Sequence, residues 1–210
     1  MEVDREDGRT ATMLRPLACS RSVLNRAHGS ASWSQGDTKV LAAVYGPKVG
    51  TKKTENPEKA SIEVIWKPKT GQIGKVVNDD GALLPCAINA ACAALVDAGI
   101  SLKHLAVAIC CCLAETGCVI LDPTKQEEQK MKASVYLVFP NSVLSVLQVS
   151  VTKIDEPMEH GIITSVTHGA MSVEDYFYCL KSGRAATAKL SNFLRSRLQN
   201  RLPSDLLGDT

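Results

Sequence analysis

The sequence predicts an α+β domain, and three features support this class. Short segments rich in Val, Ile and Leu are bounded by turn residues, as β-strands usually are. An apolar segment between Pro85 and Gly99 has the residues that favour the start and the end of a helix. A second helix is predicted from Ser172 to about Leu198. Strands interrupted by two main helices are typical of α+β proteins, and 210 residues suffice for one substantial core.

Composition narrows the class of protein further. The net charge of +2 and the pI near 8.1 say little about nucleic acid on their own. No apolar run reaches the roughly 18 residues of a membrane span, and no secretory leader opens the chain, so we expect no membrane partner. The eight cysteines lack paired CxxC motifs at zinc spacing. We therefore expect reduced core thiols, an intracellular protein, and no metal or other cofactor.

The strand predictions rest on local patterns. Gly36-Asp37 is a hairpin signal between two strand-like runs. Alternating residues in Ser61–Trp66 predict a half-buried strand, and the continuous apolar run Leu105–Leu113 predicts a fully buried one. A long polar loop is expected over 122–132. The predicted strands are 13–19, 31–35, 38–45, 61–66, 105–113, 118–121, 133–139, 143–151 and 162–166.

The first predicted helix is expected to be central and buried on all sides. Large apolar residues share one face, small residues cover the other, and Asp80-Gly81 forms a turn before the helix. A helix N-terminus after such a turn is a natural anion site. The final helix has apolar residues at helical spacing and a basic side, interpreted as a solvated face, with Lys181, Arg184, Lys189, Arg195 and Arg197. We expect a flexible terminus over 1–12, one domain over 13–199 and a tail over 200–210.

Four stretches, in order along nearly the whole chain, together resemble the RNase PH family. Residues 5–9 and 14–16 (REDGR and LRP) are similar to its R-x-D-G-R…L-R-P opening. Residues 28–47 resemble its G-S-A…G-x-T-x-V-x-A-x-V-x-G-P motif. Residues 86–99 resemble its central helix, and residues 121–124 (LDPT) its L-D-x-x strand end. Each motif is weak alone, but their order makes the combination specific.

The resemblance implies an RNase PH-like fold, related to the second domain of ribosomal protein S5. It has a mixed β-sheet, a buried central helix and a C-terminal helix. Family members pair, and three pairs close a ring around an RNA channel. The implied partners are other RNase PH-like exosome subunits, cap subunits and RNA, in the nucleus, nucleolus and cytoplasm. A self-dimer outside the ring is an alternative.

The resemblance also locates a site. Active members use inorganic phosphate to attack the 3′ end of RNA, which requires donors for the phosphate and an acid near the leaving oxygen. The family's D-G-G-T-R-T/C phosphate motif maps to Asp80, Gly81, Ala82, Leu83, Leu84 and Pro85. Its acidic pair maps to Glu128 and Ser134. The hydroxyl and guanidinium donors and one carboxylate are thus replaced, and no catalytic residue is assigned.

Three functions of different kinds remain open; the third is a protein that pairs with itself outside the ring and binds nucleic acid or another nuclease. The first is a non-catalytic ring subunit that supports assembly and guides RNA during 3′-to-5′ processing and decay. The second is a nuclease with residual phosphorolytic activity, or with metal-dependent hydrolytic activity on RNA or DNA. The carboxylates available for such a metal are Asp79, Asp80, Asp122, Glu127 and Glu128. The lost donors favour the first function.

The basic loop 67–75 is the predicted RNA contact, through Lys67, Lys69, Gln72 and Lys75. The alternative is an ordinary solvated loop. In the family a helix and a strand follow this loop, whereas here it runs directly into the turn at Val76. A helix, a strand and their connections amount to about 20–30 residues. We therefore expect a strand position and a helix-covered face to be left open.

Overall fold

The computed structural model describes residues 5–48, 61–66, 76–141 and 161–199. The described strands form two four-stranded sheets. Within each sheet, every pair of neighbouring strands is antiparallel. The resemblance had implied a mixed sheet. The first sheet has the order β1 (Leu17–Arg21), β2 (Gly29–Gln35), β3 (Thr38–Val44), β4 (Val76–Asn78). The second has the order β6 (Val119–Leu121), β5 (Ala106–Leu113), β7 (Ala133–Pro140), β8 (Thr164–Gly169). The helices are α1 (Leu83–Asp97), α2 (Lys125–Lys130) and α3 (Val173–Gln199).

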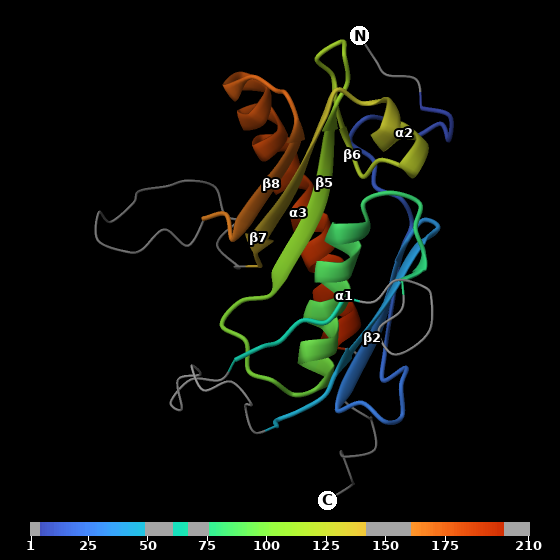
Figure 1. The fold of residues 1–210 in the computed structure, drawn as a ribbon, viewed down its shortest axis with the longest axis vertical. Helices are drawn as coiled ribbons and strands as arrows, with labels where there is room; N and C mark the ends of the chain where they lie inside the picture. Colours follow the sequence, from blue (N-terminus) through green and yellow to red (C-terminus); the bar gives the residue numbers. More distant parts are fainter. Residues whose placement is uncertain (1–4, 49–60, 67–75, 142–160, 200–210) are drawn as a thin grey trace, which may run out of the picture.

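Helix α1 joins the two sheets, because it packs on β2 and β3 of the first sheet and on β5 of the second. Helix α3 packs on β5 and β7 and reaches β1, and Figure 1 shows it behind α1. Their common core includes the fully buried Trp33, Ile109, Leu137, Leu190 and Leu194. The central buried helix and the C-terminal helix predicted from the sequence are therefore both present.

The small residues of α1, not its large ones, form its buried face. Cys86, Ala90 and Ala94 are fully buried, whereas Leu84 is 42% exposed. The prediction that this helix is buried all round is therefore wrong for its leucine face. Small side chains let β2 approach closely, and a Cβ on Gly29 of that strand would lie 2.2 Å from the amide nitrogen of Ala98.

Asn89 is a fully buried polar residue in α1 that completes a strand edge. Among the described strands, β6 pairs with β5 at Cys111–Leu113, and none meets the backbone of Ala108 on that side. The Asn89 side chain takes the place of a strand: its Nδ2 donates to the oxygen of Ala108 at 3.0 Å, and its Oδ1 accepts from the nitrogen at 2.9 Å. This pair fixes α1 against the second sheet.

Five of the nine predicted strands match closely: 31–35, 38–45, 105–113, 118–121 and 133–139. The strands predicted at 13–19 and 162–166 are displaced toward the C-terminus, as β1 and β8. The strand predicted at 61–66 is wrong, because these residues form no strand and all are exposed, with Val64 at 80%. A strand needs a hydrogen-bonded neighbour, and the short β4 pairs with β3 only through Lys39 and Val40. The strand predicted at 143–151 lies outside the described residues.

The loop predicted over 122–132 contains α2. Thr124 begins this helix with a capping box: its hydroxyl accepts from the Glu127 amide, and the Glu127 carboxylate accepts from the Thr124 amide. Ser172 and Asp175 start α3 by the same reciprocal bonds, as the sequence predicted. Val173 and Phe177 lie at the spacing of the apolar face predicted for this helix, and they were expected to be buried. Instead they are 71% and 60% exposed.

All eight cysteines are free thiols, as expected, and Cys110, Cys111 and Cys112 are buried within β5. Burial raises the pKa of the Cys111 thiol well above its ordinary value, so this thiol stays protonated at neutral pH. Among the described helices, none combines the length and the apolar character needed to cross a membrane.

Replacing Asn89 by alanine should lower the free energy of unfolding by about 2–6 kcal/mol. The reason is that the N–H and C=O of Ala108 would stay buried without partners, at about 1–3 kcal/mol each. The matched control is Asn192→Ala on the exposed side of α3, which should stay within about 0.5 kcal/mol of the wild type. Urea unfolding measures both, and equal values for the two variants would contradict the assigned role.

Candidate functional site

The candidate site lies where the turn before α1 meets α2 and β7. Gly81 has φ +85°, and a Cβ on it would lie 2.6 Å from the nitrogen of Lys125, so glycine lets the start of α2 pack against the turn. Ala82, the N-cap of α1, is in the left-handed conformation with φ 49° and provides no side-chain cap. The turn thus leads into the start of α1, which lies below α2 in the view of Figure 1.

The start of α1 offers few donors to an anion. Leu83 and Leu84 are apolar, and Pro85 is buried and has no backbone N–H. The amide of Ala82 faces Glu128 from α2, with 3.4 Å between its nitrogen and Oε2. A carboxylate of the chain itself therefore occupies the position that a bound anion would take at the positive end of the helix.

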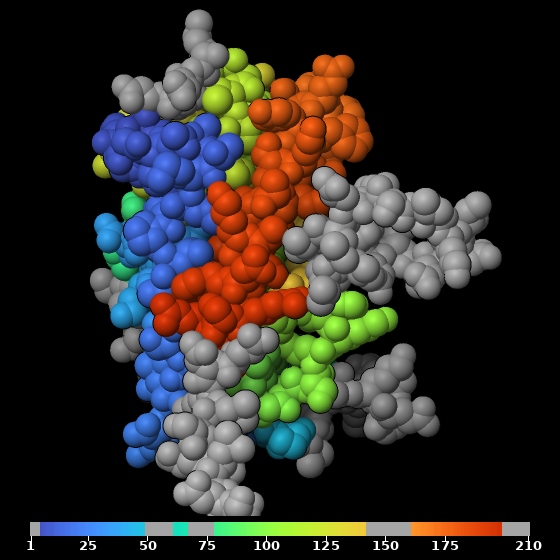
Figure 2. Space-filling model, turned by 180° about the vertical axis from the view of Figure 1, so that it is seen from behind, coloured from blue at the N-terminus to red at the C-terminus, as the bar shows by residue number. Residues whose placement is uncertain are grey.

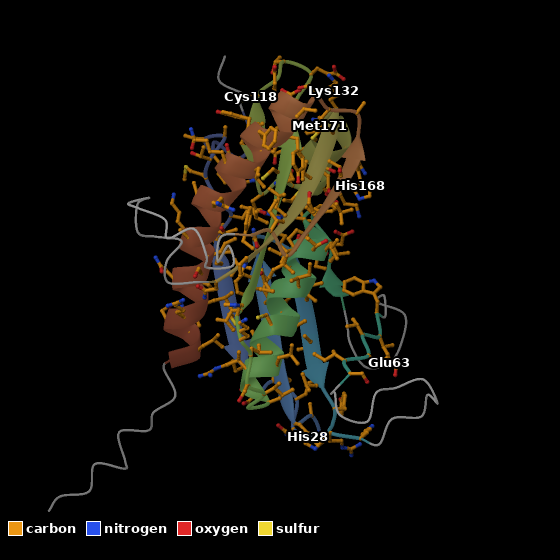
Figure 3. All side chains as sticks on the ribbon, turned by 90° about the vertical axis from the view of Figure 1, so that its left-hand side faces the viewer. His28, Glu63, Cys118, Lys132, His168 and Met171 are labelled. Atoms are coloured by element: carbon orange, nitrogen blue, oxygen red, sulfur yellow. The ribbon has the colours of Figure 1, made fainter. Side chains whose placement is uncertain are left out.

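Glu128 is held from two sides. Besides the amide of Ala82, the phenol of Tyr136 on β7 donates a hydrogen bond to Oε1. Burial first, and then this bond to Glu128, raise the pKa of Tyr136 far above its ordinary value, so the phenol remains a donor at neutral pH. The Tyr136 ring also packs against the His168 ring, with 5.4 Å between the two ring centroids. Figure 3 labels His168 on the outer strand β8.

Ser134 lies on the same face of β7 as Tyr136, two residues before it. Its register partners are Cys112 on β5 and His168 on β8, and it is 7% exposed. The structure therefore brings Ser134 to the side of the second sheet where Glu128 lies. The hydroxyl that bonds Glu128 is nevertheless that of Tyr136, because no hydrogen bond joins Ser134 to Glu128.

A buried ion pair between Arg15 and Asp122 holds the turn that precedes α1. Asp122 is fully buried at the end of β6 and receives two hydrogen bonds from the Arg15 guanidinium on Oδ1, at 3.0 and 2.7 Å. The Arg15 amide donates to Oδ2 at 2.7 Å. The guanidinium also donates to the carbonyl oxygens of Asp80 and Gly81, and Thr38 donates to Gly81 at 2.7 Å. The backbone of the turn is thereby fixed.

A second arginine ties the N-terminal segment to the same place. The Arg5 side chain is fully buried, binds the Glu127 carboxylate through two nitrogens at 2.7 Å each, and donates to the carbonyl oxygens of Leu121 and Asp122. Residues 1–12 were expected to be a flexible terminus; of these, residues 5–12 are described, and these bonds hold Arg5. Arg5 and Arg15 belong to the family motifs in the sequence, but no local pattern indicated this structural role.

The carboxylates considered for a metal are distributed among different partners. Asp122 binds Arg15, Glu127 binds Arg5, Asp79 pairs with Lys125 at 2.8 Å, and Glu128 binds Tyr136. Within the part of the chain that the structure describes, no three His, Cys, Asp or Glu side chains gather as metal ligands would. A cavity of about 260 Å³ next to this region is lined by Glu6, Asp7, Asp80, Thr124, Gln126 and Glu127.

The site residues predicted from the resemblance fall into two groups. Asp80, Leu83, Leu84, Pro85 and Glu128 meet around the start of α1. Ser134 lies nearby on β7, and the loop residues Lys67, Lys69, Gln72 and Lys75 lie outside the described residues. Sequence reasoning missed Tyr136 and Asn89. For Tyr136, the available signal was a polar residue at alternate positions of a strand. For Asn89, it was a polar residue within an apolar helix.

Comparison with known proteins places this geometry in a family. The model of the 3′ exoribonuclease family, domain 1 (RNase PH), matches residues 13–72. An Arabidopsis thaliana protein, the exosome complex exonuclease RRP46 homolog, is 64% identical over 232 residues, covering 95% of this chain and 97% of that protein. The chain belongs to the RNase PH family.

Solved structures agree with this family assignment. The crystal structure of rice Rrp46 is 52% identical, superposes with a TM-score of 0.81 and covers 93% of this chain and 100% of that one. An archaeal exosome core structure superposes with a TM-score of 0.71 at 16% identity, covering 91% of each chain, which shows the shared fold. The α+β RNase PH-like fold expected from the sequence is therefore confirmed.

The same comparisons bear on the segment expected to be missing. The alignment with the Arabidopsis protein extends over 232 residues, although this chain has 210, so that protein contains residues without a counterpart here. The match to the RNase PH family model ends at residue 72, just before the junction at Lys75–Val76. The three-residue β4 begins at this junction.

Replacing Glu127 by glutamine should destabilise the protein at neutral pH and have progressively less effect in acid. Burial alone would raise the pKa of Glu127, but hydrogen bonds from Arg5 and the Thr124 amide lower it below its usual 4.5. A group whose pKa is lower in the folded state stabilises above its unfolded pKa and loses this contribution as pH falls through the folded value.

The measurement is urea unfolding of wild type and Glu127→Gln between pH 7 and pH 3, with Glu115→Gln, at an exposed turn, as the control. The wild-type advantage over Glu127→Gln should shrink below about pH 4.5. An advantage that stays constant down to pH 3 would show that the carboxylate charge is not what Arg5 recognises.

Proposed function

We propose that this chain is a non-catalytic subunit of an RNA exosome core ring. It supports ring assembly and guides RNA for 3′-to-5′ processing and decay. The start of α1 carries this proposal, because its donors for phosphate are replaced by Leu83, Leu84 and Pro85 and its amide of Ala82 faces Glu128. The full-length similarity to the RRP46 homolog, named as a protein of the exosome complex, supports the assignment to a ring.

The physical reason is the cost of placing an anion there. A phosphate at this position would lose water against two leucine side chains and would meet the negative charge of Glu128. The hydrogen bonds that offset such a loss in an active site come from positioned donors, and these are what the substitutions remove. Phosphorolysis therefore lacks both its binding site and one carboxylate, at Ser134.

The partners in this proposal are other RNase PH-like subunits of the ring, its cap subunits and RNA. A self-dimer of the chain is the alternative partner. The proposed locations are those of exosome function, the nucleus with the nucleolus and the cytoplasm.

A residual nuclease is the second candidate. The Arabidopsis relative is named an exonuclease, and acidic side chains, among them Asp80 and Glu127, line the cavity beside the turn. A divalent cation held there would activate water for hydrolysis in place of phosphate attack. The two candidates differ in whether RNA is shortened, and in whether magnesium or phosphate is required.

Purified protein should release no nucleoside diphosphate from 3′-labelled RNA when phosphate and magnesium are supplied. The same incubation with magnesium and no phosphate, and with EDTA, tests for hydrolysis. Glu128→Gln serves as the internal control, because any genuine residual activity at this site should fall when its carboxylate is removed. Phosphate-dependent release of diphosphates that Glu128→Gln abolishes would refute the non-catalytic assignment.

The basic loop carries the RNA-guiding part of the proposal. Changing Lys67, Lys69 and Lys75 together to alanine should weaken binding of single-stranded RNA and make its salt dependence shallower, by up to about one unit of slope per lost phosphate contact. The matched control removes three exposed lysines elsewhere, as Lys39→Ala, Lys103→Ala and Lys132→Ala. Equal affinity and slope in a folded loop variant would leave a solvated loop as the correct interpretation.

A further inference from the structure

The exposed side of α3 has an uneven composition along its length. Near its start Phe177 and Tyr178 are 60% and 58% exposed. From Tyr176 to Gln199 the helix contains no Asp or Glu, and its cations are Lys181, Arg184, Lys189, Arg195 and Arg197. Figure 2 shows α3 crossing the back of the molecule at its surface. Aromatic rings near the start of the helix are therefore followed by positive charge along its length.

The cations of this face have few acidic partners. Within the described residues, no carboxylate forms an ion pair with Lys181, Lys189, Arg195 or Arg197. The two arginines are held in place by neutral groups. Arg195 donates to the Asn141 side-chain oxygen at 2.8 Å and to its carbonyl oxygen at 3.2 Å, and the Arg197 guanidinium lies 5.4 Å from the Phe193 ring centroid.

A structural role explains only part of this charge. Arg195 and Arg197 lie in the last turns, where the negative end of the helix dipole favours cations. Lys181 and Lys189 lie in the middle of the helix, where the dipole gives no such benefit, and both are exposed. Their positive charge is unbalanced, and it attracts an anionic partner.

The aromatic residues point to the kind of anion. Phe177 and Tyr178 lie four and three residues before Lys181, so the three side chains share one exposed region of the helix. A basic helix face that contacts only water gives no reason for two exposed aromatic rings. Single-stranded nucleic acid offers both a flat base for each ring and a phosphate for each cation, and stacking tolerates any base.

We propose that the outer face of α3, formed by Phe177, Tyr178, Lys181, Lys189 and Arg195, binds single-stranded RNA. Bases stack on the two rings, and the following phosphates bind the cations. From Phe177 to Arg195 the helix rises about 27 Å, a length that admits more than one nucleotide. The proposal takes its polymer, RNA, from the proposed function, but it adds a binding surface distinct from the loop 67–75.

The test measures fluorescence anisotropy of a labelled single-stranded RNA 20-mer with the full chain at several salt concentrations. Phe177→Ala with Tyr178→Ala should weaken binding by at least about fivefold and leave the salt slope unchanged, because stacking is worth about 1–3 kcal/mol per base. Lys181→Ala with Lys189→Ala should lower the slope by up to about two units. Lys103→Ala with Lys132→Ala removes the same charge elsewhere and should change both quantities little.

Three outcomes would overturn the proposal. The first is unchanged RNA affinity and slope in both α3 variants while circular dichroism shows them folded. The second is full affinity of Phe177→Leu with Tyr178→Leu, since leucine keeps the apolar contact and loses the ring. The third is normal RNA binding by the α3 variants together with loss of assembly with RNase PH-like partners, which would identify a protein contact.

These outcomes are separable from those for the proposed function. Failure of the wild-type chain to enter a ring, or phosphate-dependent activity, counts against the proposed function whatever the α3 variants do. A loss of RNA binding confined to the loop variant, with the α3 variants intact, supports RNA guiding and overturns only the α3 surface.

Discussion

The buried carboxylate of Asp122 is the constraint on which the rest of this structure depends. A fully buried charge must be paired, and removing its partner typically costs about 3–5 kcal/mol. Arg15 is the partner of Asp122, and its guanidinium also donates hydrogen bonds to the carbonyl oxygens of Asp80 and Gly81. One interaction therefore connects the N-terminal segment, the end of β6 and the turn before α1. The position of α1, which joins the two sheets, follows from it.

The same framework explains how a phosphate site can be lost without loss of the fold. The contacts that fix the turn come from Arg15 and Thr38, which hold backbone oxygens and do not use the side chains of residues 82–85. Leucines and a proline can therefore replace anion donors there while the helix keeps its place. Glu128 accepts hydrogen bonds from the Ala82 amide and from the Tyr136 phenol, so its carboxylate is part of the structural framework at this end of α1.

The first sheet ends in a short edge strand. Strand β4 has three residues and pairs with β3 at Lys39 and Val40, so most of the β3 edge lacks a partner among the described strands. Residues 61–66 have the alternation of a strand and remain exposed, because a strand pattern without a neighbour to bond cannot form a strand.

The sequence by itself determined the α+β class, the buried strand with its three cysteines, the hairpin at Gly36-Asp37 and the two main helices. These features depend on local period and turn chemistry, which act over a few residues. Its motifs also identified the family. Only the tertiary structure decided which face of α1 is buried, because the close approach of β2 selects small residues over large ones. Only the tertiary structure could pair Arg5 with Glu127 and Tyr136 with Glu128, since these contacts join separate elements and no local pattern encodes their geometry.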